Sequence, residues 1–131
     1  MSREIKFKIF ANEKWYYKCL VGNTNNTSDD NWTCPLVWSD EKKDWVHCDN
    51  GVICQYTGLK DKNGVEIYEG DILKDQYEQF YKVLWDDFKI SFQMEQFYTK
   101  SRYSIFPTDL LNMEIIGNIY ENPELLEVSD E

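Results

Sequence analysis

Six carboxylates are the residues whose types and spacing could support chemistry. They are Glu66, Glu69, Asp71, Asp75, Asp86 and Asp87. Paired carboxylates can serve as a general acid and base, or they can hold a divalent cation. Each of the six, however, falls at an expected turn, where aspartate commonly accepts hydrogen bonds from backbone amides. We therefore favour a structural role for these side chains.

The motifs of common catalytic sites do not occur in this sequence. It has no Gly-x-Ser-x-Gly, no phosphate-binding Gly-Lys-Ser/Thr and no His-Glu-x-x-His. The only histidine, His47, stands close to Trp45 and is expected to be structural or on the surface. We therefore assign no catalytic residue, no metal ligand and no cofactor, and we favour a protein that is not an enzyme.

The four cysteines are not spaced as a structural zinc site usually requires. They are Cys19, Cys34, Cys48 and Cys54, and no two of them form a Cys-x-x-Cys pair. A cytosolic location is expected, because the sequence has neither a signal peptide nor an apolar run approaching the ~20 residues that cross a bilayer. In that compartment disulfides are disfavoured, so we expect mostly buried thiols and no membrane partner.

The charge of the chain argues against a broad nucleic-acid interface. The net charge is −10, from 24 acidic and 14 basic side chains, whereas binding to phosphate backbones needs clustered Lys and Arg. Trp15, Tyr16, Tyr17 and Lys18 have the composition of a single-strand stacking surface in miniature. In a chain with 16% aromatic residues we favour core packing for them.

The chain is organised around residues 55–73, which read as strand, turn, strand, turn and strand. Asn63-Gly64 predicts a type I′ hairpin turn, because both residue types tolerate positive φ. Glu69-Gly70-Asp71 predicts a second tight corner. Strands are expected over residues 5–10, 15–21, 35–38, 45–48, 52–56, 65–68, 72–73, 80–85, 89–94, 103–106 and 113–120.

The remaining stretches predict turns and short helices. Residues 22–33 are polar and predict a loop, and residues 35–38 predict a short edge strand. Residues 108–111 predict one helical turn, and Gly117 predicts a bulge. Asn122 and Pro123 are typical of a helix start, with Asn as the N-cap.

These short strands predict an all-β fold in one domain over residues 1–131. We expect a small SH3-like barrel, running from Gly70 to Gly117, with an additional N-terminal hairpin or sheet built from residues 5–10 and 15–21. A short C-terminal helix follows the last strand.

Two stretches of sequence resemble the signatures of the YopX family of phage and prophage proteins. Residues 55–72, Gln-Tyr-Thr-Gly-Leu-Lys-Asp-Lys-Asn-Gly-Val-Glu-Ile-Tyr-Glu-Gly-Asp-Ile, resemble its central signature, and residues 115–126, Ile-Ile-Gly-Asn-Ile-Tyr-Glu-Asn-Pro-Glu-Leu-Leu, its C-terminal one. Glu4–Phe7 is similar to its opening, but Lys8–Ala11 departs from the Arg-x-Trp-Asp run frequent there, and residues 22–50 have no match. The resemblance implies a mostly β fold and a phage or prophage origin, and it brings no catalytic residue.

Ten residues of these motifs are candidates for structural turn positions or surface contacts. They are Tyr56, Asp61, Asn63, Gly64, Tyr68, Glu69, Gly70, Asp71, Gly117 and Asn118.

The function predicted from the sequence is binding rather than catalysis. We expect an accessory protein in the cytoplasm of a bacterial host, which contacts a host or phage protein or assembles with itself through edge strands such as residues 5–10. The alternatives are a nucleic-acid-associated small barrel and an acidic inhibitor of a host DNA-binding enzyme, whose carboxylates would present a field like that of nucleic acid.

Overall fold

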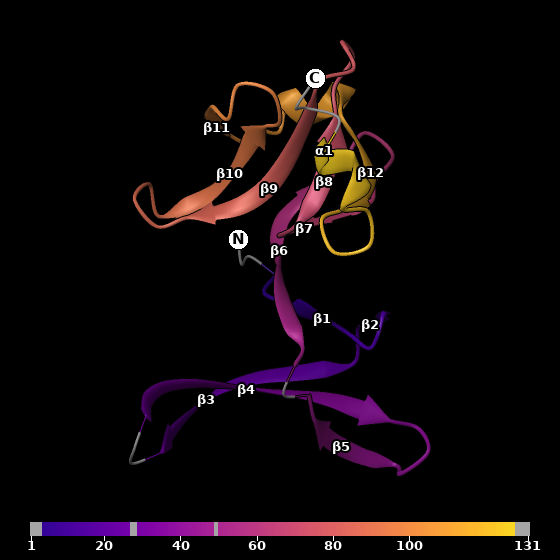
Figure 1. Ribbon diagram of the computed structural model, residues 1–131, viewed down its shortest axis with the longest axis vertical. Coiled ribbons are helices and arrows are strands. Elements are labelled where there is room, and N and C mark those ends of the chain that lie inside the picture. The colour runs from indigo at the N-terminus through magenta and orange to yellow at the C-terminus, as the bar shows by residue number, and fades with distance from the viewer. Residues whose placement is uncertain (1–3, 27–28, 49, 128–131) are drawn as a thin grey trace. The chain divides into compact units, whose positions relative to one another are not determined.

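The computed structural model describes residues 4–26, 29–48 and 50–127, and β-strands dominate it (Figure 1). The strands are β1 (Phe7–Ala11), β2 (Lys14–Tyr16), β3 (Cys19–Asn26), β4 (Asp29–Ser39), β5 (Asp44–His47), β6 (Val52–Lys60), β7 (Glu66–Tyr68), β8 (Asp71–Lys74), β9 (Phe80–Asp86), β10 (Ser91–Gln96), β11 (Arg102–Ser104) and β12 (Glu114–Asn118). The helical elements are the 3-10 turn η1 (Asp109–Asn112) and the short helix α1 (Glu124–Glu127). The predicted mostly β fold with a short C-terminal helix is confirmed. No helix among the described residues is long and apolar enough to cross a lipid bilayer.

The chain divides into two compact units. The N-terminal unit contains Ile5–Gln55, and the C-terminal unit contains Tyr56–Glu131 together with Met1–Glu4. Strand β6 belongs to both: its first four residues pair with β1, and its later residues pair with β7. A single domain over the whole chain stays a prediction.

Strand β1 lies between β2 and β6 in the N-terminal unit. It turns into β2 through Asn12 and Glu13, whose φ angles of 55° and 61° are those of a type I′ hairpin turn. Since β1 has a neighbour on each side, the expectation that it is an edge strand free to pair between copies is wrong. Among the described residues of this unit, four buried side chains pack into one hydrophobic cluster: Ile9, Ala11, Val37 and Cys48.

The expected loop over residues 22–33 is wrong for the backbone that the structure describes there. Strand β3 continues to Asn26 and β4 begins at Asp29, and the two strands pair antiparallel; residues 27–28 lie outside the described chain. Asn, Ser and Thr can satisfy backbone groups locally, but an antiparallel neighbour satisfies them along the whole strand. The long pairing therefore outweighs the turn preference of the individual residues.

The expected edge strand around Pro35 is also wrong, because β4 is the central strand of the sheet β3-β4-β5. Pro35 has no N–H, yet its carbonyl accepts a hydrogen bond from the N–H of Cys48 at 3.0 Å. The strand therefore loses only one donor at this position. The single strand expected over residues 15–21 is likewise divided, into β2 and the start of β3.

The C-terminal unit is built on a five-stranded antiparallel sheet in the order β11-β10-β9-β8-β12, with β9 and β10 visibly curved (Figure 1). In the part of this unit that the structure describes, six buried side chains pack into one hydrophobic cluster: Ile67, Leu73, Val83, Met94, Leu110 and Met113. Leu110 belongs to η1, so the predicted helical turn at residues 108–111 is confirmed and contributes to the core. The predicted bulge is confirmed too, since the register of β12 on β8 shifts between Ile115 and Gly117.

The turn at Asn63-Gly64 reverses the chain between β6 and β7 as predicted, but its type differs. Only Gly64 has positive φ, at 80°, whereas a type I′ turn requires this of Asn63 as well. The N–H of Gly64 donates to the carbonyl of Asp61 at 3.0 Å, which is the bond of a type I turn over residues 61–64. The cause is the Asp61 side chain, which accepts a hydrogen bond from the N–H of Asn63 at 2.9 Å and so fixes an Asx turn.

The start of α1 also differs from the prediction. The helix begins at Glu124 rather than directly after Asn122. The side-chain Oδ1 of Asn122 accepts a hydrogen bond from the N–H of Asn118 at 3.1 Å, so Asn122 closes the turn that precedes the helix.

The turn between β9 and β10 holds Ile90 in a strained backbone conformation. Its φ is 52°, which is unfavourable for a β-branched residue, and its side chain is 74% exposed. We expect Ile90→Asn to raise the free energy of unfolding by about 1 kcal/mol, since Asn tolerates this region and little apolar burial is lost. Urea unfolding followed by tryptophan fluorescence measures the change.

Ile90→Val is the matched control, because valine keeps the branch at Cβ and hence the strain. Its stability should equal that of the wild type within about 0.5 kcal/mol. An Asn variant less stable than the Val variant would show that Ile90 makes a contribution other than strain.

Candidate functional site

Asp61 connects the central signature to the last strand of the sheet. Its side chain is buried, and Oδ1 accepts hydrogen bonds from the N–H groups of Asn63 and Val65, both at 2.9 Å. Its Oδ2 accepts a third, from the N–H of Ile115 in β12, at 3.0 Å. The neighbouring Lys62 N–H donates to the carbonyl of Met113 at 2.9 Å. Segments more than fifty residues apart are thus joined at one carboxylate.

The corner at Gly70 is the second junction between the two signatures. Gly70 has φ of 93°. Its N–H donates a hydrogen bond to the carbonyl of Val83 at 2.8 Å, and its carbonyl accepts a hydrogen bond from the N–H of Ile119 at 2.9 Å. A Cβ at this position would lie 2.6 Å from Cε2 of Tyr120. Asp71 completes the corner, since its Oδ2 accepts a hydrogen bond from the N–H of Tyr68 at 2.8 Å.

Asn118, opposite Asp71 in the sheet, organises the turn that follows β12. Its Oδ1 accepts hydrogen bonds from the N–H groups of Tyr120 and Glu121 at 3.1 and 2.8 Å. The position before Asn118 requires glycine, because a Cβ on Gly117 would lie 2.5 Å from Oδ1 of Asn122.

The other motif residues lie partly in the interior and partly at the surface. The rings of Tyr56 and Tyr68 are buried and lie 5.5 Å apart between centroids. Asn63 and Gly64 are exposed at the tip of their turn, and Glu69 is half-buried. Five motif residues therefore make the hydrogen bonds and close backbone contacts around β8 and β12: Asp61, Gly70, Asp71, Gly117 and Asn118. Asn63 and Gly64 remain on the surface.

The carboxylates considered for catalysis do not converge on one point. Asp71, Asp75 and Asp86 each accept hydrogen bonds from backbone N–H groups, as the turn interpretation predicts. Glu66 lies in β7 rather than in a turn, and Asp87 is exposed. Within the part of the chain that the structure describes, no three His, Cys, Asp or Glu side chains are placed to hold a metal ion.

The small aromatic cluster near the N-terminus is only partly packed: Trp15 and Tyr16 are half-buried, whereas Tyr17 is 66% exposed, so core packing does not hold for it. The Trp15 ring packs on Phe10 at 4.9 Å between centroids, and the Lys8 ammonium lies 4.0 Å from the Trp15 centroid. Lys18 lies 3.9 Å from the ring of Trp38. His47 is exposed at the end of β5, and Cys19 is half-buried with its thiol donating to the carbonyl of Phe7 at 3.4 Å.

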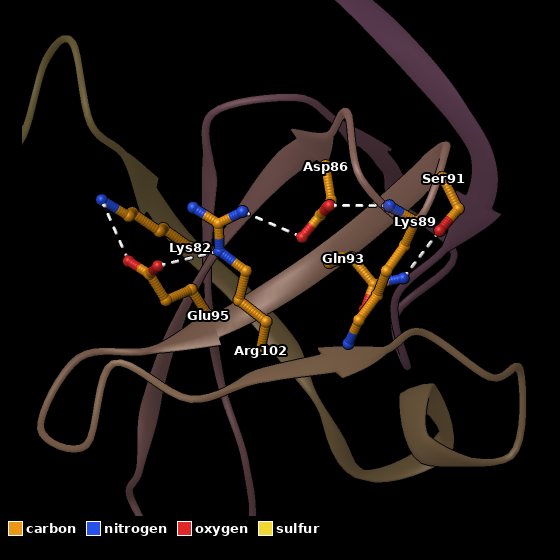
Figure 2. Close-up of polar contacts among 7 residues, drawn as sticks. All are labelled: Lys82, Asp86, Lys89, Ser91, Gln93, Glu95 and Arg102. Carbon is orange, nitrogen blue, oxygen red and sulfur yellow. Dashed lines mark hydrogen bonds and ion pairs between the residues drawn. The ribbon is translucent and has the colours of Figure 1, made fainter.

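One face of the β9-β10-β11 sheet carries a network of ion pairs and polar contacts (Figure 2). Strand register places Glu95 opposite both Lys82 and Arg102. Lys82 Nζ lies 3.3 Å from Glu95 Oε2, and Arg102 bonds Glu95 through Nε at 3.1 Å and Asp86 through Nη1 at 2.9 Å. Asp86 also accepts a hydrogen bond from the N–H of Lys89 at 2.9 Å.

Gln93 extends this face toward the β9-β10 turn. Its side chain is only 2% exposed, and Nε2 donates to Oγ of Ser91 at 2.7 Å (Figure 2). Among the described residues its Oε1 has no hydrogen-bond donor. On this face Gln93, Asp86 and Glu95 are therefore screened from solvent, whereas Lys82 and Arg102 are partly exposed.

The network keeps its carboxylates ionised. The backbone N–H of Lys89 and the guanidinium of Arg102 lower the pKa of Asp86. Burial raises the pKa of Glu95, but hydrogen bonds from Arg102 and Lys82 outweigh it and the pKa lies below its ordinary value. The pKa of Arg102 is raised by Asp86 and Glu95. These side chains are bound to one another as ion pairs, which is the arrangement of a structural network rather than of a proton-transferring pair.

We expect this network to make stability depend on acid pH. A carboxylate whose pKa is lowered on folding stabilises the fold above its ordinary pKa, and this contribution is lost as pH falls through the lowered value. Arg102→Leu should therefore reduce the difference in free energy of unfolding between about pH 7 and about pH 2.5. Urea unfolding at both pH values measures it.

Lys62→Leu is the control, because it removes one exposed positive charge outside the network. Its pH dependence should match that of the wild type. An equal loss in both variants would assign the effect to net charge rather than to the ion pairs.

The opposite face of the same sheet, toward η1, carries two adjoining hollows with aromatic walls. One has a volume of about 480 Å³ and the other about 210 Å³. Tyr81, Met94 and Asp109 line both of them. Tyr103 and Phe106 line the larger hollow, and their side chains are 45% and 58% exposed. Sequence reasoning missed this site, because its residues come from four separate segments with no shared spacing.

Together these features define a small, mostly β protein in which two distant stretches of sequence are tied together by turn hydrogen bonds. The sequence matches the family described as YopX protein over residues 6–127. The chain belongs to the YopX family.

The structure is similar to two solved bacterial proteins. Protein EF1440 from Enterococcus faecalis aligns with a TM-score of 0.68 and 25% identity, over 95% of this chain and 99% of that one. Protein yopX from Bacillus subtilis aligns with a TM-score of 0.61 and 16% identity, over 91% of this chain and 95% of that one. At 16% identity, the similarity to yopX from Bacillus subtilis shows a shared fold alone. No curated protein sequence matches the chain.

Proposed function

We propose that this protein is a phage or prophage accessory protein that acts without catalysis, by binding a host or phage protein or by associating with itself. Membership of the YopX family supports the origin. The observation that carries the binding role is the exposed apolar surface beside β11. Tyr103 and Phe106, which both line the larger hollow, are 45% and 58% exposed there. Exposed apolar side chains grouped together are typical of interaction surfaces.

The position of β11 at the end of the sheet supports the same role. Among the strands that the structure describes, it pairs with β10 alone. An antiparallel strand directs alternate backbone N–H and C=O groups away from its partner, so one edge of β11 offers such groups to another chain. A partner segment that pairs there would also reach the exposed aromatic rings.

A pull-down from bacterial host lysate, with and without nuclease, tests the proposal. The expected result is a specific partner that is retained after nuclease treatment and lost with Tyr103→Ser/Phe106→Ser. Tyr98→Ser is the matched control, because Tyr98 is 70% exposed in the turn between β10 and β11. Light scattering on the same three proteins measures self-association. The proposal is overturned if the double variant binds and assembles as the wild type does.

The acidic-inhibitor role is the second candidate, and the excess of 24 acidic over 14 basic residues favours it. In that case the captured partner would be a DNA-binding enzyme, and DNA would compete for it. The nucleic-acid-associated alternative predicts that the protein is retained on heparin or single-stranded DNA at low salt and is released at high salt.

The proposed role includes a barrel type, a domain organisation and a cellular location. We propose an SH3-like barrel for the C-terminal unit, supported by its short curved antiparallel strands, and an additional hairpin from β1 and β2. We further propose that the whole chain acts as one domain in the cytoplasm of the bacterial host. The match of the family over both units supports the first part of that statement.

A further inference from the structure

The hollows beside β11 combine aromatic rings with carboxylates. Tyr81, Tyr103 and Phe106 supply the rings, and Asp75 and Asp109 supply the charges. The face of an aromatic ring attracts a cation, and a neighbouring carboxylate adds to that attraction. The walls therefore favour a positively charged group over a neutral or negative one.

The Tyr81 ring is held in place by its neighbours. Its hydroxyl donates a hydrogen bond to Oδ2 of Asp75 at 2.9 Å, and its ring meets that of Tyr103 edge to face at 6.3 Å between centroids. Burial, together with the bond to Asp75, raises the pKa of Tyr81 to about 12. The phenol stays neutral, so the carboxylates are the charges in this wall.

Among the described residues, no cation–aromatic contact is found on the rings of Tyr81, Tyr103 or Phe106. Lys62 and Lys74 line a separate hollow that shares Asp75, so Asp109 is the carboxylate that matters most here. Arg102 lines the larger hollow, but its guanidinium is paired with Asp86 and Glu95. The Asp109 carboxylate accepts a long hydrogen bond, 3.4 Å, from the N–H of Phe106.

We propose that this aromatic hollow binds a Lys or Arg side chain of the partner protein, with the cation against Tyr103 and Phe106 and opposite Asp109. The inference rests on the proposed binding function and names the chemistry of the partner. Charge complementarity selects a basic residue, and the open edge of β11 beside the hollow offers backbone groups to the segment that carries it.

Small amides of single amino acids test this without knowledge of the partner. N-acetyl-lysine methylamide and the corresponding arginine amide are titrated into the full-length protein, and NMR shifts of Met94, Tyr81 and Tyr103 are followed. Saturable shifts with a dissociation constant on the order of millimolar are expected, because one cation–aromatic contact is weak. N-acetyl-norleucine methylamide, which lacks the charge, should produce no saturable shift.

Variants assign the binding to the hollow. Asp109→Asn and Tyr103→Leu should each weaken binding of the lysine amide about fivefold. Tyr98→Leu, outside the lining, should leave it unchanged. Backbone NMR spectra of each variant show whether the fold is retained.

The competing outcomes separate this inference from the function on which it rests. Equal binding of the norleucine amide, or binding of choline without binding of either basic amide, overturns the inference. A pull-down that still depends on Tyr103 and Phe106 would then leave the binding function standing. If the basic amides bind but no partner is captured, the site is supported and the proposed function is not.

Discussion

Asp61→Ala is expected to lower the free energy of unfolding by about 3–5 kcal/mol, an exceptional loss for one side chain. The carboxylate is 7% exposed and accepts three backbone hydrogen bonds, from Asn63, Val65 and Ile115. Alanine leaves these donors without their partner in a partly buried place, and each bond to a charged group contributes about 1.5–3 kcal/mol before relaxation. Urea unfolding by circular dichroism and fluorescence measures the loss.

Two further variants separate the parts of this effect. Asp61→Asn keeps an acceptor for the two bonds within the turn but replaces the oxygen that receives Ile115, so an intermediate loss is expected. Asp87→Ala, at an exposed turn position, should stay within about 0.5 kcal/mol of the wild type. If Asp61→Ala behaved like Asp87→Ala, the carboxylate would not be the junction described.

Gly70→Ala is expected to lower the free energy of unfolding by about 3 kcal/mol or more. Two costs add: a φ of 93° is unfavourable for any residue with a Cβ, and that Cβ would lie 2.6 Å from the ring of Tyr120. The corner cannot shift freely, because the N–H and C=O of Gly70 are both hydrogen-bonded. Thermal and urea unfolding measure the change.

Gly64→Ala provides the comparison for the backbone cost alone. Gly64 also has positive φ, at 80°, but no atom of the described residues lies within 4 Å of the Cβ that would be added. A loss of about 1–2 kcal/mol is expected there. The Tyr120→Leu background should recover part of the loss in Gly70→Ala. Equal losses at Gly70 and Gly64 would show that the ring gives way without cost.

The central region of the fold could be predicted because its signals are local. Asn63-Gly64 marks a chain reversal whatever its exact geometry, and Gly70 marks a corner that only glycine fits. The turn type follows from the hydrogen bond between Asn63 N–H and the Asp61 side chain, which outweighs the type I′ preference of Asn63-Gly64. The bond from Ile115 to the other oxygen of Asp61 could not be predicted, because Ile115 lies 54 positions further along the chain.

The strands β3 and β4 show the opposite case. Residues 22–33 have the composition of a loop, and pairing with a neighbouring strand reverses that local preference. Such pairing depends on two segments together, so the composition of either segment alone does not indicate it. For the same reason, the central position of β4, the strand that contains Pro35, could not be predicted.

The candidate site was the least predictable part. The carboxylates Asp71, Asp75 and Asp86 could be assigned to turns from their local sequence. The aromatic hollow could not be found, because Tyr81 and Tyr103 come together only when β9, β10 and β11 align. Among the aromatic residues that are closest in sequence, Trp15 packs on Phe10 of its own unit, whereas Tyr17 is exposed.

The sheet order has a consequence for synthesis on the ribosome. All strands of the N-terminal unit have been made once Gln55 is added, so that unit can form while translation continues. The C-terminal unit must wait for β12, the neighbour of β8 and the donor to Asp61, which is made last of its described strands. Nascent chains arrested before residue 113 should therefore be cut by protease mainly after Gln55.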